Sequence, residues 1–130
     1  MNEVLHKTQV FKHMCKYNGN KWESKIEVVC ADVYKITVGS HSRLICAFRN
    51  KSRWIPMDVL TGIALQGNFT TKTTALQAIV EYFEKILDPE YPVMISHTLK
   101  QFNRREKELF KALDENQKVC YNRLVDLCEN

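Results

Sequence analysis

The sequence predicts an α+β protein: an antiparallel meander sheet of 3 to 5 strands with one helix packed across it, a short N-terminal helix and a long C-terminal helical segment. Three observations support this class. Residues 22–57 alternate apolar and polar side chains, residues 70–87 carry apolar side chains at helical spacing, and residues 93–130 contain no glycine or proline. With 130 residues, 45% of them hydrophobic, the chain can build one buried core without disulfides.

The N-terminal segment, residues 2–16, is expected to form the short helix. Its apolar side chains between Val10 and Cys15 recur at three- and four-residue intervals, and lysines surround them. Asn18-Gly19-Asn20 then predicts a turn, because glycine and asparagine tolerate positive φ angles. This turn separates the expected helix from the sheet.

Strand periodicity begins at Trp22 and continues to Val38. A straight strand of that length would measure roughly 56 Å, which is too long for a small domain. We therefore expect a bend, bulge or turn near Ala31-Asp32. Polar turns at residues 39–42 and 50–52 separate two further strands, and the second is an edge strand because its proline cannot donate to a ladder.

One helix is expected to lie across the sheet. Thr70 to Lys72 supply its N-cap, and apolar side chains from Leu76 to Leu87 form one continuous stripe. The helix ends at Asp88, because the residue before a proline disfavours the helical conformation. Residues 1–92 are thus predicted to form the α+β domain.

Residues 93–130 are expected to be a C-terminal helical segment for dimerisation or interaction. A single helix from Ser96 to Glu129 would measure about 50 Å, more than one small sheet can cover. The segment either breaks near Asp114 into an antiparallel pair or projects and packs against another copy. We favour a homodimer, because a projecting apolar seam must be buried. The predicted interface is Leu99, Phe102, Leu109, Leu113, Cys120, Leu124 and Leu127.

The five cysteines predict reduced thiols. No two of them lie closer than eight positions, so neither a paired disulfide framework nor a CxxC motif is present. Cys30 and Cys46 are expected to pack in the core. No apolar stretch approaches the ~20 residues of a membrane span, and residues 1–7 lack the features of a secretory signal. We expect a cytoplasmic protein that has no contact with a membrane.

No motif predicts an enzyme, a metal site or a cofactor. The four histidines form neither HxxxH nor HExxH spacing, and no glycine-rich phosphate loop is present. His41 between two serines is the nearest approach to a nucleophile and base, and a polar turn is the better explanation of it. We therefore expect a non-enzymatic binding protein without catalytic residues.

Charge is unevenly distributed along the chain. Residues 1–53 carry ten Lys/Arg against four Asp/Glu, whereas residues 54–130 carry nine against eleven. Cations neutralise phosphates and an exposed indole can stack on a base. The sequence thus predicts a basic sheet face that binds nucleic acid or another acidic partner. The predicted contacts are Arg43, Arg49, Lys51, Arg53, Trp54 and Lys72.

Other interpretations remain open at this point. Small size and the lack of catalytic motifs also fit a phage or mobile-element type of inhibitor or adaptor that acts by protein–protein interaction. A pocket at the sheet or the dimer seam would instead hold a small anionic, nucleotide-like ligand. The same cations are also explained by a solvated sheet edge, where they discourage aggregation.

Overall fold

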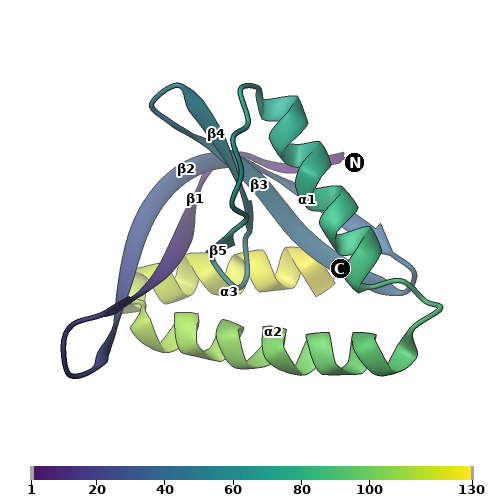
Figure 1. Cartoon of the computed structure of the whole chain (residues 1–130). Helices are drawn as coiled ribbons and strands as arrows, with labels where there is room; N and C mark the ends of the chain where they lie inside the picture. The colour runs from purple at the N-terminus through teal and green to yellow at the C-terminus, as the bar shows by residue number, and fades with distance from the viewer. Residues whose placement is uncertain (1, 130) are drawn as a thin grey trace.

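The structure is a computed structural model that describes residues 2–129, and it contains one antiparallel sheet and three helices (Figure 1). The sheet order is β1-β2-β3-β4-β5, so each strand pairs with its neighbours in sequence. The predicted α+β class and antiparallel meander are confirmed. The elements are β1 (Asn2–Tyr17), β2 (Trp22–Val38), β3 (His41–Asn50), β4 (Arg53–Asp58), β5 (Ile63–Ala64), α1 (Lys72–Ile86), α2 (Pro92–Ala112) and α3 (Glu115–Glu129).

Helices cover both faces of the sheet. Alternate residues of a strand point to opposite faces. In β3, Leu44, Cys46 and Phe48 pack in one core cluster with α3, whereas Ile45 and Ala47 pack in a second cluster with α1. Helix α2 contributes side chains to both clusters. The expectation of one helix across the sheet is therefore incomplete, because the C-terminal helices form a second layer.

Strand β1 occupies the segment that was expected to be a short N-terminal helix, and that prediction is wrong. It pairs with β2 along its length as far as Tyr17↔Trp22. Val10 and Phe11 are both fully buried, although adjacent residues of a strand point to opposite faces. A strand buried on both faces brings apolar residues together in the sequence, and this pattern resembles helical spacing.

Helices α2 and α3 form a hairpin, which is the alternative to a single projecting helix. Leu113 takes an extended conformation, with ψ 148°. Asp114 and Gln117 then cap α3 reciprocally: the Gln117 N–H donates to Asp114 Oδ1 (2.8 Å) and the Asp114 N–H donates to Gln117 Oε1 (3.0 Å).

This hairpin packs most of the predicted dimer interface against its own chain. Leu109, Leu113 and Leu124 are buried in the cluster on the α3 side of the sheet. Among the half-buried members, Leu99 and Phe102 pack on the α1-side cluster, Cys120 packs on the α3-side cluster, and Leu127 lies on α3. The homodimer stays a prediction, but these side chains do not need a second copy to cover them.

The sheet divides into two hairpins at one end. Strands β2 and β3 pair only from Tyr34 to Val38 of β2; before that stretch β2 pairs with β1 alone, and after it β3 pairs with β4 alone. Alternate turns of a meander lie at the same end of a sheet. The β1–β2 and β3–β4 loops therefore project from one side of the molecule, at the left of Figure 1. We call residues 16–25 the aromatic hairpin and residues 49–53 the basic hairpin.

The two edges of the sheet curl toward each other, so that β1 meets the β4–β5 connection. The His13 N–H donates to the carbonyl of Gly62 (2.8 Å). Gly62 has φ +70°, and a Cβ at this position would lie inside contact distance of the Phe11 carbonyl oxygen. Only glycine fits both requirements, so this residue allows the two edges to approach.

All five cysteines are free thiols, as expected. Cys46 is buried, and burial raises the pKa of its thiol well above the ordinary value. Cys30 is exposed, so its expected core position is wrong. It lies on the part of β2 that extends beyond β3, where only β1 flanks the strand.

Candidate nucleic-acid interface

Three of the six predicted contact residues lie together on the basic hairpin. Arg49 is near the end of β3, Lys51 is in the turn and Arg53 begins β4, and all three are exposed. The Arg49 Nε donates to the carbonyl of Lys51 (3.1 Å), which holds the two residues in a fixed arrangement. Within residues 2–129 none of the three forms an ion pair. These charges are therefore open to an anionic ligand.

Arg43 does not belong to this exposed surface. It lies near the start of β3, at the opposite end of this strand from the basic hairpin, and is only 7% exposed. Its Nε and Nη2 donate to the two oxygens of Asp58 (3.1 and 2.6 Å), and its Nη1 donates to Glu106 Oε1 (3.0 Å). The guanidinium carbon also lies 4.6 Å from the centre of the Phe102 ring. Its donors are engaged inside the protein, so Arg43 is not available to a phosphate.

The electrostatics of this network are those of a structural ion pair. Burial on its own would lower the pKa of Arg43, but the charges and hydrogen bonds of Asp58 and Glu106 together raise it above the ordinary value. Burial raises the pKa of Glu106, against the opposing effect of Arg43. Asp58 Oδ2 also accepts from the backbone N–H and the hydroxyl of Thr61 (3.0 and 2.6 Å). The network joins β3, the end of β4 with the turn that follows it, and α2.

The remaining predicted contacts, Lys72 and Trp54, also have partners within the chain. Lys72 Nζ donates to Asp32 Oδ2 (2.6 Å) and lies 5.3 Å from the centre of the Tyr34 ring. Trp54 is half-buried against the α1-side cluster, and its backbone N–H donates to the carbonyl of Phe69 (2.8 Å). The exposed site therefore consists of the basic hairpin without these two residues.

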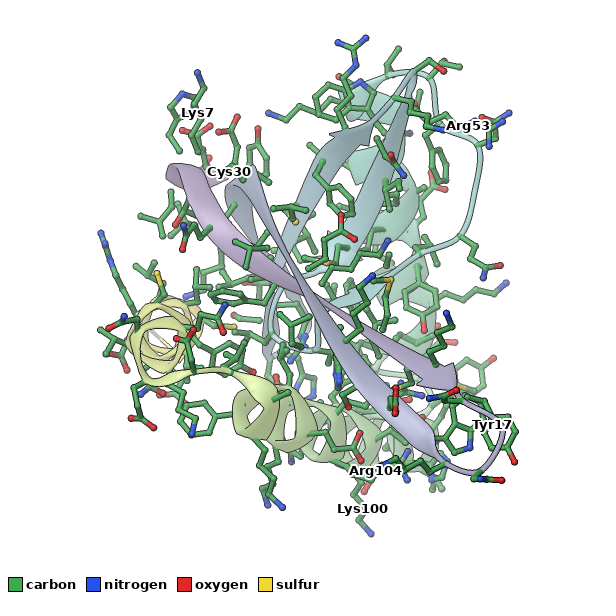
Figure 2. The ribbon with its side chains drawn as sticks, turned by 90° about the vertical axis from the view of Figure 1, so that its left-hand side faces the viewer. Lys7, Tyr17, Cys30, Arg53, Lys100 and Arg104 are labelled. Atoms are coloured by element: carbon green, nitrogen blue, oxygen red, sulfur yellow. The ribbon has the colours of Figure 1, made fainter. Side chains whose placement is uncertain are left out.

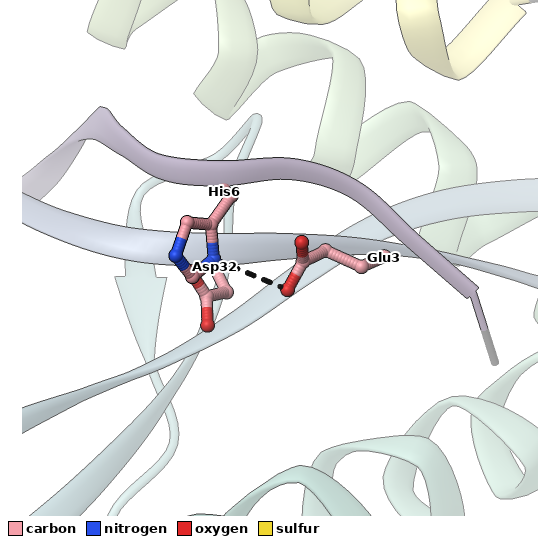
Figure 3. A group of neighbouring side chains, drawn as sticks. All are labelled: Glu3, His6 and Asp32. Atoms are coloured by element: carbon pink, nitrogen blue, oxygen red, sulfur yellow. Dashed lines mark ion pairs between the residues drawn. The ribbon is translucent and has the colours of Figure 1, made fainter.

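A histidine and two carboxylates converge where β1 is irregular (Figure 3). His6 Nδ1 lies 2.7 Å from Asp32 Oδ1 and 3.5 Å from Glu3 Oε2, so the three residues could each offer one ligand atom to a metal. However, Asp32 also accepts from Lys72 and from the backbone N–H of Lys7 (2.9 Å). Because a metal would compete with these donors, we interpret the group as an ion-pair network that fixes the bulge.

The aromatic hairpin is a second exposed surface, and the sequence analysis missed it. Tyr17 and Trp22 are 55% and 71% exposed, and their ring centres lie 5.3 Å apart. Tyr17 is labelled at the tip of the β1–β2 ribbon in Figure 2. A signal was present, because these aromatic residues flank the Asn18-Gly19-Asn20 turn. The expected helix over residues 2–16 concealed the cross-strand pair.

A cleft of about 750 Å³ lies between α2, α3 and the β2–β3 turn. Leu99, Phe110 and Val125 give it an apolar wall, and its charged lining is mixed. Lys107 and Lys111 of α2 add positive charge, whereas Glu106 and Glu129 add negative charge, of which Glu106 is paired with Arg43. Tyr121, which also borders the cleft, donates to the Leu60 carbonyl (2.5 Å). The volume of this cleft is in the range found for small-molecule binding sites.

Comparisons with known proteins do not identify this site, so its interpretation depends on its own chemistry. No protein-family model matches the chain, and neither the curated proteins nor the solved structures give a match. Within residues 2–129, no helix has both the length and the apolar character needed to cross a membrane. The fold defines an α+β protein with a forked antiparallel sheet.

Proposed function

We propose that this protein binds nucleic acid through the basic hairpin and performs no catalysis itself. The observation that carries this proposal is the group of three exposed cations at residues 49–53, a segment that contains no acidic residue. Phosphate groups are the ligands best suited to such a group, because each cation that neutralises a phosphate releases condensed counterions. Arginine adds planar donors that match phosphate oxygens in pairs.

The contrast with the other arginine of β3 supports this interpretation. Arg43 forms a buried pair with Asp58 and Glu106, whereas Arg49 and Arg53 have no acidic partner within residues 2–129. Exposure alone does not distinguish a binding group from ordinary solvated side chains. The position of the three cations does, because on a projecting turn they can approach a phosphate backbone without a clash from the helical layers. The loop stands clear of the helices in Figure 1.

Charge reversal on the basic hairpin tests the proposal. We expect the double variant Arg49→Glu with Arg53→Glu to bind labelled DNA and RNA oligonucleotides at least roughly tenfold more weakly. The salt dependence should also become shallower, by about 0.7 to 0.9 in logarithmic slope for each phosphate that the variant no longer neutralises. Fluorescence anisotropy over a series of salt concentrations measures both quantities.

The matched control is Lys100→Glu with Arg104→Glu on the exposed face of α2. It changes the net charge by the same amount, and the side chains point away from the sheet in Figure 2. This control should bind like the original protein. An equal loss of affinity in both double variants would show that overall charge, rather than the basic hairpin, controls binding. Absence of nucleic-acid binding by the original protein would overturn the proposal.

The cleft favours a second candidate function, the binding of a small anionic, nucleotide-like ligand. Its apolar wall would contact a ring, and Lys107 and Lys111 would meet the negative charge. A nucleotide that co-purifies and is released on denaturation would support this candidate. Loss of that nucleotide in Lys107→Glu with Lys111→Glu, but not in Arg49→Glu with Arg53→Glu, would locate it in the cleft.

A further inference from the structure

We infer that the aromatic hairpin is a base-stacking element and that it makes single-stranded nucleic acid the preferred ligand. This inference rests on the proposed function of the basic hairpin and specifies its substrate class. It starts from the exposure of Trp22, which is 71%, beside Tyr17 at 55%. Large aromatic rings gain most from burial, so two of them at one exposed tip indicate a surface completed by a ligand.

The local structure holds these rings in place. Tyr17 and Trp22 form the last pair of the β1–β2 ladder, and their rings contact at an interplanar angle of 53°. The turn is closed by the Asn18 N–H, which donates to the carbonyl of Lys21 (2.9 Å), and Gly19 adopts φ +67°. The rings are thus presented on a defined turn rather than on a long loop, which lowers the entropic cost of binding.

The charge around the rings favours a polyanion over a neutral or basic partner. Lys16, Lys21 and Lys25 are exposed within residues 16–25, and Glu23 is the single acidic residue there. Glu23 Oε1 accepts from the side-chain amide of Asn18 (3.3 Å), so it belongs to the turn. Aromatic rings beside several lysines combine base stacking with phosphate contacts, as single-strand binding sites do.

The fork of the sheet brings the two hairpins to one side of the protein. Arg53 and Tyr17 lie far apart along the side that faces the viewer in Figure 2. A flexible strand can follow this side and reach both hairpins. A duplex keeps its bases paired and stacked, so its bases are not free to stack on Tyr17 and Trp22. The geometry therefore predicts a preference for unpaired bases.

The affinity test compares oligothymidylate with a duplex of mixed sequence. We expect Tyr17→Ala with Trp22→Ala to bind oligothymidylate roughly tenfold more weakly or worse, since stacking contributes to each base contact. Duplex binding should change by less than about twofold. Tyr91→Ala is the control, because Tyr91 is an exposed aromatic residue (53%) in the loop between α1 and α2. It should bind both ligands normally, and all variants should keep the original urea midpoint.

Fluorescence tests the stacking contact directly. The chain has two tryptophans, so Trp54→Phe leaves Trp22 as the only one. Oligothymidylate should quench this emission in proportion to binding, while the free phosphodiester backbone of an abasic oligomer should bind without the same quenching. Equal affinity of the original protein and the Tyr17→Ala, Trp22→Ala variant for oligothymidylate would overturn the stacking role.

The two proposals fail in different ways. If the original protein binds nucleic acid through the basic hairpin but the aromatic variants change nothing, only the stacking inference is wrong. If the original protein binds no nucleic acid, both proposals are wrong. If the aromatic variants lose a protein partner while keeping oligothymidylate affinity, the aromatic hairpin is a protein-docking surface and the stacking inference is again wrong.

Discussion

Arg43 and Arg49 show how two arginines of one strand acquire different roles. Both have the same phase in the alternation of β3. Arg43 is nevertheless buried between Asp58 and Glu106, while Arg49 is exposed. The two acidic partners lie 15 and 63 positions away in the sequence. Residue type and strand phase cannot report such partners, so only the folded chain separates a structural arginine from a free one.

Replacement of these arginines should therefore have different effects on stability. We expect Arg43→Gln to lower the free energy of unfolding by about 3 kcal/mol or more, because it leaves buried carboxylates without their cation. Arg49→Gln should change it by less than about 0.5 kcal/mol, since the side chain is exposed. Urea denaturation measures both values. A cost for Arg43→Gln no larger than that for Arg49→Gln would contradict the structural role of Arg43.

At the scale of elements, Asp32 joins three segments through one carboxylate. It lies on β2, accepts from Lys72 at the start of α1, and accepts from the Lys7 backbone where β1 bulges. An irregularity was expected near this position, and the structure shows register shifts of β1 between Glu3 and Thr8. The bulge aims His6 at the carboxylate, which a regular ladder would not do.

The stabilising effect of Asp32 should depend on pH. The hydrogen bond from Lys72, followed by that from the Lys7 backbone, lowers the pKa of Asp32 below its ordinary value. The folded state thus favours the ionised carboxyl, and the stabilisation is complete above the unfolded pKa, about 4. It is lost as the pH falls from there through the lower folded pKa.

Stability measurements between neutral and acidic pH test this effect. Compared with Asp32→Asn, the original protein should be more stable at neutral pH, and the difference should shrink below about pH 4. Asp126→Asn is the control, because Asp126 is exposed on α3 and has no ion pair within residues 2–129. A stability difference for Asp32→Asn that is the same at every pH would contradict the link to ionisation.

At the scale of the whole molecule, the sheet is shaped by its division and its closure. It opens into two hairpins at one end, yet β1 returns to the β4–β5 connection through the bond from His13 to Gly62. Helices on both faces then bury two core clusters. The proposed ligand surface lies on the hairpins that the helices leave uncovered.

Closure of the sheet makes a clear prediction for Gly62. Gly62→Ala should cost about 1–3 kcal/mol more than Gly19→Ala, since both positions have positive φ but only Gly62 lacks space for a Cβ. The Gly19 variant controls for backbone strain, because its Cβ would meet nothing within 4 Å. Thermal or urea unfolding gives the comparison. Equal costs would show that β1 can move away from Gly62 freely.

The sequence determined the features that depend on neighbouring residues. The strand alternation from Trp22, the turns, the capped helix that ends before Pro89 and the exposed cations of the basic hairpin all follow from local pattern. The break at Asp114 was also available as an alternative, because a single helix from Ser96 to Glu129 would be longer than one small sheet can cover.

Features that depend on partners distant in the sequence followed from the tertiary contacts alone. The tertiary structure turned residues 2–17 into a strand, because β2 supplied a ladder over their length. It also paired Arg43 and Lys72 with carboxylates from other elements, which leaves them outside the proposed binding surface. Finally, it placed the aromatic hairpin beyond the helical layers. Burial and charge compensation are properties of segments brought together by folding, and a linear pattern does not contain them.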